Sequence, residues 1–88
     1  MVRLILAMEI FVGNLSYSAT EEELYELFSK YGEVASITIC IDENTGRALG
    51  RAFVEMPDND AAVKAILALN GKELDGRRIR LAPSTRIK

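Results

Sequence analysis

The chain has 88 residues, of which 49% are hydrophobic and 27% are charged, and this composition is typical of a single globular domain. It contains no histidine and only one cysteine, Cys40, which excludes an intramolecular disulfide, a multi-cysteine zinc site and a histidine base. The formal net charge of −2 by itself disfavours nucleic-acid binding, because phosphate contacts need positive charge. No apolar run is long enough to cross a membrane, so we expect no membrane association. Because the usual side-chain ligands are missing, we also expect no metal and no cofactor.

The charges are unevenly distributed along the chain. Five glutamates and one lysine lie in residues 21–33, whereas four arginines and one lysine, with no acidic residue, lie in residues 76–88. Because the local potential matters more than the total charge, the basic C-terminal region remains a candidate for phosphate contacts.

Residues 1–7 form an apolar N-terminal extension before the first predicted element. Three interpretations are open: an upstream extension ahead of a natural start at Met8, a prolongation of the first strand, or an apolar patch that pairs two copies. We prefer the first two and expect a monomer, with a dimer through the extension as the alternative.

The first half of the chain predicts a strand and a helix. Glu9–Asn14 reads as the first strand, and a capping box of Thr20 and Glu23 begins a helix. Gly32 is placed to end this helix in a left-handed conformation. Apolar residues at helical spacing give it one core-facing stripe: Leu24, Leu27, Phe28 and Tyr31.

The second half predicts two further strands, a helix and a last strand. Val34–Ile41 and Arg51–Met56 are the second and third strands, and a helix follows Pro57 and ends at Asn70-Gly71. Residues 72–76 are a short connection, and Arg77–Ala82 is the fourth strand, which Pro83 closes. The order β-α-β-β-α-β is that of a ferredoxin-like α+β sandwich, with both helices on one face of a four-stranded antiparallel sheet.

Strand alternation places aromatic and basic side chains on the opposite, open face. If Ile10, Val12 and the other aliphatic positions face the core, the remaining strand positions face outward. This outward set includes two aromatics, three arginines, two strand-two residues and two carboxylates: Phe11, Phe53, Arg51, Arg78, Arg80, Thr38, Cys40, Glu9 and Glu55. Planar rings stack on bases and arginines contact phosphates, so the open face suits single-stranded RNA, or single-stranded DNA.

Two segments resemble the signatures of the RNA-recognition motif family: Ile10–Leu15 its hexapeptide, and Leu49–Met56, in part, its octapeptide. The resemblance implies a domain over residues 8–83, a basic tail over 84–88, and strand order 4-1-3-2. It further implies that Phe11 stacks on one base and that Phe53 packs on a second base or between sugars. The compact form resembles small single-domain bacterial RNA-binding proteins.

Some positions depart from the family pattern or keep two interpretations. Arg51 stands where an aromatic is usual and Leu49 where a cation is usual, so Arg51 either stacks on a base or pairs with a nearby glutamate. Arg47 either replaces the missing cation or is a solvated turn residue. Tyr17 either stacks on a base at the rim or packs on its own loop, and we prefer the loop. We expect Asn14 to hydrogen-bond within its own turn and not to RNA.

The basic tail also has two interpretations. Arg86 and Lys88 either cross the bound RNA or are solvated.

The predicted function is therefore binding of single-stranded RNA in the cytoplasm. The alternative is a protein-interaction module that binds a peptide on its helical face, which the acidic first helix favours. Lys72-Glu73-Leu74 lacks the aromatic residue that this variant class carries there. We expect no enzyme, since Gly13-Asn14-Leu15 lacks the arginine and donor cluster of a phosphate-cradling loop.

Overall fold

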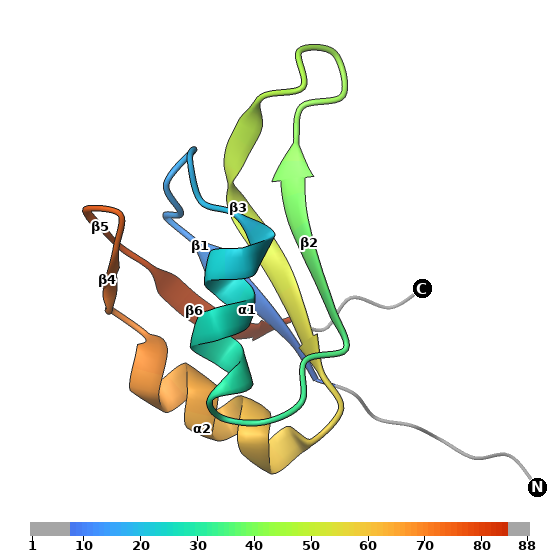
Figure 1. Cartoon of the computed structure of the whole chain (residues 1–88), viewed down its shortest axis with the longest axis vertical. Coiled ribbons are helices and arrows are strands. Elements are labelled where there is room, and N and C mark those ends of the chain that lie inside the picture. Colours follow the sequence, from blue (N-terminus) through green and yellow to red (C-terminus); the bar gives the residue numbers. More distant parts are fainter. Residues whose placement is uncertain (1–7, 85–88) are drawn as a thin grey trace, which may run out of the picture.

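The computed structural model describes residues 8–84, which form the predicted β-α-β-β-α-β arrangement with one additional hairpin (Figure 1). The elements are β1 Met8–Gly13, α1 Glu21–Ser29, β2 Ser36–Ile41, β3 Ala48–Met56, α2 Asn59–Leu69, β4 Glu73–Leu74, β5 Arg77–Arg78 and β6 Arg80–Ser84. The apolar extension lies outside the described residues, as do Arg86 and Lys88 of the tail.

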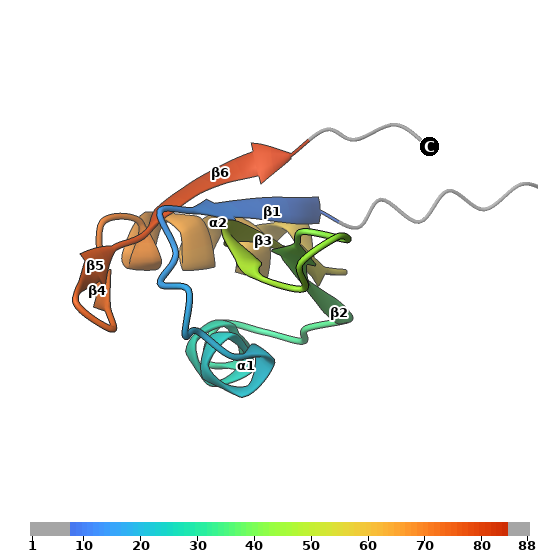
Figure 2. The same cartoon turned by 90° about the horizontal axis from the view of Figure 1, so that it is seen from above.

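The main sheet is antiparallel and has the order β2-β3-β1-β6, which confirms the predicted order with the first and third strands at the centre. Both helices lie on the same side of this sheet (Figures 1 and 2). No other described element covers the opposite face, so the side chains that point there meet solvent.

The core fills the space between the sheet and the helices. Alternate residues of β1 and β3 are buried together with Leu81 of β6, and Leu24 and Phe28 of α1 are fully buried against them. In α2 the buried face is made of small side chains and one leucine: Ala61, Ala62, Ala65 and Leu69. All buried side chains of the described residues are hydrophobic, so this face of the sheet is devoted to packing.

The predicted capping box at the start of α1 is confirmed, but the predicted left-handed glycine at its end is wrong. The Glu23 backbone N–H donates to Thr20 Oγ1 at 3.2 Å, and the Thr20 backbone N–H donates to Glu23 Oε1 at 3.0 Å. The helix ends at Ser29, and Gly32 does not adopt a left-handed conformation. A Cβ on Gly32 would lie 2.5 Å from the Ala61 Cβ, so glycine is needed there because the chain passes close to α2.

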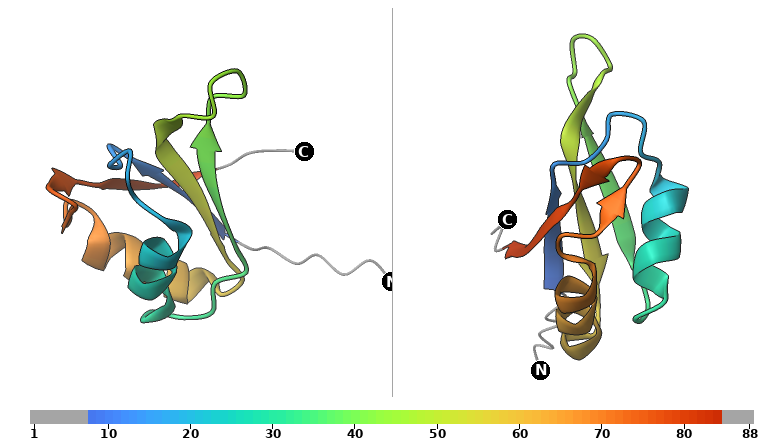
Figure 3. Two further views of the ribbon diagram at one scale, coloured as in Figure 1. Left: turned by 45° about the horizontal axis from the view of Figure 1, so that its top comes forward. Right: turned by 90° about the vertical axis from the view of Figure 1, so that its left-hand side faces the viewer.

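The predicted fourth strand is divided into two. Residues 72–76, predicted as a connection, contribute β4, which pairs with β5 in a hairpin next to the C-terminal end of α2 (Figures 1 and 3). Its turn residues Asp75 and Gly76 have φ of 52° and 81°, as an Asp-Gly hairpin turn requires. The sheet strand β6 runs through Pro83, which pairs with Ile10 instead of closing the sheet. Proline is tolerated there because β6 is an edge strand.

The hairpin turn creates a pH-dependent contact with α1. Desolvation raises the pKa of Asp75 above its ordinary value of 3.8, and the charge of Glu23 and a hydrogen bond with it raise it further. The native state therefore binds more protons than the unfolded state just above pH 3.8, so this group's contribution to stability falls as pH rises through that window. We expect Asp75→Asn to gain melting temperature relative to the parent as pH rises from 3.5 to 7, with Glu43→Gln as the control. A difference that is independent of pH would contradict this.

Candidate nucleic-acid interface

Phe11 and Phe53 lie side by side at the centre of the uncovered face. They are direct partners in the β1–β3 register, and their ring centroids are 5.7 Å apart at an interplanar angle of 61°. Both side chains are half-buried, whereas the next residue along each strand is fully buried in the core. This confirms the predicted alternation and leaves part of each ring open to a planar partner.

The residues on this face form three rows across the strands. The aromatic row runs from Ala82 on β6 through the two phenylalanines to Thr38 on β2, which is exposed. The row on one side is acidic at its centre, because Glu9 pairs with Glu55, whose carboxylate accepts a 3.2 Å hydrogen bond from Ser36 Oγ.

The row on the other side of the rings is basic. Gly13 pairs with Arg80, and Arg51 lies one residue beyond the last β1–β3 pair, Val12 with Ala52. Both arginines are exposed. The face therefore has a positive and a negative end, with the two rings between them.

Gly13 fixes the position of the Phe11 ring. A Cβ on Gly13 would lie only 2.8 Å from Phe11 Cε2, a distance that requires one of the two groups to move. The ring therefore lies over the backbone of Gly13, in the space that any other side chain would occupy. This explains why glycine follows the aromatic position by two residues on the same face.

Gly50 of β3 is the point at which the loop that follows β1 contacts the sheet. Its φ of 77° is in the left-handed region, and the β2–β3 register shifts next to it. Its carbonyl accepts a 2.9 Å hydrogen bond from the Leu15 backbone N–H, and a Cβ would lie 3.2 Å from both the Leu15 carbonyl oxygen and Tyr17 Cε1. The glycine of the octapeptide thus allows the loop and the Tyr17 ring to approach the sheet.

The structure reveals a cluster at the rim that the sequence analysis missed. Arg77 donates from Nη2 to Asn14 Oδ1 at 2.6 Å, and its guanidinium carbon lies 6.0 Å from the Tyr17 ring centroid. Asn14 also donates from Nδ2 to the Arg78 carbonyl at 2.8 Å, whereas we expected it to bond within its own turn. Tyr17 is 69% exposed, so it does not pack into its loop as preferred. Only the unpredicted hairpin brings Arg77 to this position.

Several of the other predicted site residues line one of two hollows on the surface. One of about 570 Å³ is lined by Phe11 together with Arg78, Arg80 and neighbouring residues of β6, so these three predicted residues share one surface. The other, of about 690 Å³, lies at the end of the sheet where β3 begins and is lined by Tyr17, Arg47, Leu49 and neighbouring residues. Arg47 is therefore at the rim next to Tyr17 and not on the aromatic row.

Within residues 8–84, no group of three or more potential metal-binding side chains is found. No helix of this part of the chain is long and apolar enough to span a membrane.

The comparisons with known proteins agree with this geometry. Two solved structures superpose on almost the whole chain. The RNA-binding protein PG1 has a TM-score of 0.87 at 40% identity and covers 92% of this chain and 98% of its own. The Rna15 RRM with bound RNA (GU) has a TM-score of 0.78 at 32% identity and covers 89% and 83%.

A curated relative is the human cleavage stimulation factor subunit 2 tau variant, which is 43% identical over 72 residues. The match covers 82% of this chain but only 12% of that protein, so the chain spans a small part of the relative's length. The model of the RNA recognition motif matches residues 10–80. The chain therefore belongs to the RNA recognition motif family.

Proposed function

We propose that the chain binds single-stranded RNA on the open face of its sheet, with Phe11 and Phe53 stacking on bases. The observation that carries this proposal is the pair of half-open rings on the two central strands, in register and uncovered by any described element. A solved relative at 32% identity that holds RNA supports it. Each stack of a base on an aromatic ring contributes ~1–3 kcal/mol.

The charge distribution gives the bound strand a preferred path. The phosphates would follow the basic end of the face, near Arg51 and Arg80, and avoid the end that carries Glu9 and Glu55. Thr38 places a hydroxyl next to Phe53, where it can donate to or accept from a base edge. We propose that Arg51, which is exposed two residues before Phe53 on β3, stacks its guanidinium on a base in place of the usual aromatic.

The rim extends the site at the basic end. Arg47 and Tyr17 line one hollow there, and Arg78 lies with Arg80 along the other. We propose that these side chains contact the nucleotides next to the two stacked bases. Arg86 and Lys88 follow β6 in sequence, and we propose that the tail crosses the same RNA.

Substituting Gly13 tests whether the orientation of the Phe11 ring matters. Gly13→Ala places a Cβ where the ring edge lies, so the ring must swing away from its position on the sheet. We expect RNA affinity to fall about tenfold, the equivalent of ~1.4 kcal/mol, as a displaced ring stacks poorly. Gly76→Ala is the matched control for adding a methyl group: its Cβ would meet nothing within 4 Å and it lines neither hollow of the site, although its φ of 81° will cost stability. Equal RNA affinities in the parent and Gly13→Ala would contradict the stacking role of Phe11.

Neutralising Arg78 and Arg80 tests the path of the phosphates. Each phosphate contact to a single strand contributes about 0.7 to the slope of log K against log salt. The double substitution to glutamine is expected to reduce this slope by roughly 1.4 if each arginine contacts one phosphate. Lys30 and Lys64, which are exposed on the helices, provide the control pair. An unchanged slope would place the phosphates elsewhere.

The remaining predictions stay proposals. We propose a monomer in the cytoplasm, a location that the single free cysteine is compatible with. The predicted likeness to small bacterial proteins gains no support from the curated relatives, which include human and Arabidopsis proteins.

A further inference from the structure

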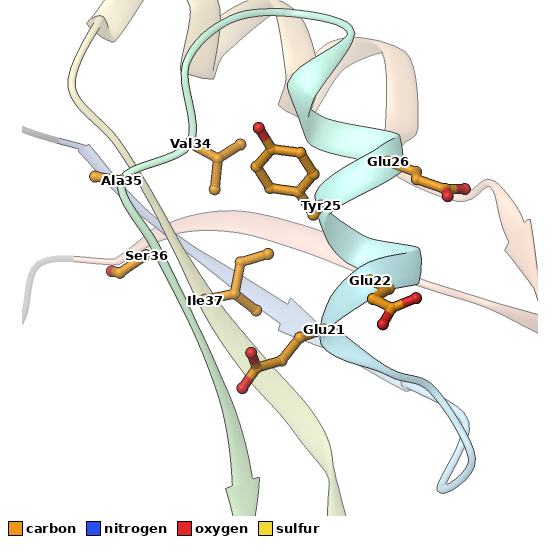
Figure 4. Close-up of a pocket in the computed structure, with 8 residues that line it drawn as sticks. All are labelled: Glu21, Glu22, Tyr25, Glu26, Val34, Ala35, Ser36 and Ile37. Carbon is orange, nitrogen blue, oxygen red and sulfur yellow. The ribbon is translucent and has the colours of Figure 1, made fainter.

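A separate hollow of about 410 Å³ lies between α1 and β2, on the helical side of the sheet (Figure 4). Its lining comes from α1 and from the segment that enters β2: Glu21, Glu22, Tyr25, Glu26, Val34, Ala35, Ser36 and Ile37. The Phe11 and Phe53 rings are on the other side of the sheet, so this hollow plays no part in the proposed RNA site.

The floor and one wall of this groove are apolar. Figure 4 shows the Tyr25 side chain extending from α1 toward Val34 and Ile37. Tyr25 is 52% exposed, and Val34 and Ile37 are only partly buried against the core. An open apolar hollow bounded by an aromatic ring is the kind of surface that takes a partner's side chain.

The rim of the groove is negatively charged. Glu21, Glu22 and Glu26 line it, and no lysine or arginine does. Glu21 and Glu22 lie in the first turn of α1 and also favour the helix by complementing its dipole, but Glu26 lies beyond that turn and gains nothing from it. The charge of the rim therefore selects for a positively charged partner.

The other border of the groove is an edge strand. Among the described residues β2 pairs only with β3, so half of its backbone N–H and C=O groups point outward. Its sequence, Ser36–Ile41, contains no charge and no proline, the two features that commonly protect an exposed edge from pairing. A groove between an edge strand and a helix suits a peptide that adds to the sheet and inserts alternate side chains.

We propose that this groove binds an extended basic segment of a partner protein, which pairs with β2 as an added strand. One apolar side chain of the segment enters between Tyr25 and Ile37, and flanking lysines or arginines pair with the α1 glutamates. Because the groove and the aromatic row lie on different sides of the sheet, peptide and RNA bind at the same time. The proposal is independent of RNA binding.

The test uses a capped hexapeptide with lysine at positions 1 and 5, leucine at position 3 and serine at positions 2, 4 and 6. Alternate positions of a strand point to the same face, so the lysines and the leucine all point toward α1. Amide shifts of the full chain are followed by NMR during titration. Shift changes are expected along α1 and β2, and the peptide with glutamate in place of lysine is expected not to bind.

Variants of the chain separate the two contributions. Tyr25→Ala is expected to weaken peptide binding about tenfold, in line with loss of part of a buried apolar contact. Glu22→Lys with Glu26→Lys is expected to weaken it more than tenfold. Glu73→Lys, an exposed glutamate outside the groove, should leave it unchanged, and RNA affinity should be unchanged in Tyr25→Ala. Peptide affinity that none of these substitutions alters would overturn the proposal.

Backbone pairing is tested with N-methylated peptides. Methylating every second amide removes the donors of one edge of the peptide, so one of the two possible sets should abolish binding while the other preserves it. Equal effects of both sets would rule out an added strand. Self-association of the chain that Tyr25→Ala abolishes would also overturn the proposal, since a second copy would then occupy the groove.

Discussion

Replacing both Phe11 and Phe53 by alanine is expected to raise the dissociation constant for single-stranded RNA by about two orders of magnitude or more. Each ring is assigned one stack of ~1–3 kcal/mol, and every ~1.4 kcal/mol is a factor of ten. The domain should remain folded, because both rings are partly exposed and neither belongs to the buried core. Their mutual contact contributes about 0.5–1.5 kcal/mol beyond the area that they bury, so its loss together with that area lowers the melting temperature by at least several degrees. Fluorescence anisotropy with a labelled RNA and a thermal melt measure both effects.

The matched control for this double variant is an exposed aromatic residue on another surface. Tyr25 is 52% exposed on α1, on the helical side, so Tyr25→Ala should preserve RNA affinity. If the double phenylalanine variant is folded and still binds RNA as the parent does, the sheet face is not the RNA site.

Phe28→Ala is expected to have the opposite profile, with a large loss of stability. Phe28 is fully buried between α1 and the sheet, and such truncations cost about 3–5 kcal/mol. A domain of this size has only about 5–15 kcal/mol of stability, so the substitution removes a large part of it and lowers the melting temperature far more than the double phenylalanine variant does. Urea unfolding at low temperature gives the change in free energy, and RNA affinity of the fraction that remains folded should be close to that of the parent.

Phenylalanine-to-alanine substitutions at these three positions thus distinguish residues that bind RNA from a residue that packs in the core. A small stability loss in Phe28→Ala would contradict the assignment of the core. A large loss in RNA affinity at a temperature where Phe28→Ala is fully folded would mean that the helix side contributes to binding directly.

Local patterns account for the features that were predicted correctly. Period-two alternation identified the faces of β1 and β3, and therefore the aromatic pair, because each strand has one face buried. The capping box identified the start of α1, since both of its hydrogen bonds are made within four residues. The strand order came from the family resemblance and not from any local pattern.

The predictions for Gly32 and Asn14 were wrong because contacts with residues distant in sequence determine what these two residues do. Gly32 is glycine because α2 passes close to it, which the sequence around Gly32 does not reveal. Asn14 bonds to Arg77, more than sixty residues away, so its expected local turn bond loses to a tertiary partner.

The hairpin of β4 and β5 has a local signal that the sequence analysis passed over. Asp75-Gly76 is a dipeptide that favours a two-residue hairpin turn. Assigning it as a connection left Arg77 out of the candidate site and joined Arg78 to the strand of Arg80. The rim cluster with Tyr17 was missed for the same reason.

The central claim is that RNA occupies the open face of the sheet, and amide-shift mapping with a short mixed-sequence RNA tests it most directly. We predict that the changes cluster on Phe11, Arg51, Phe53 and the β5 and β6 arginines, and that α1 and α2 stay unchanged. Changes confined to the helices, or none at millimolar RNA, would contradict it.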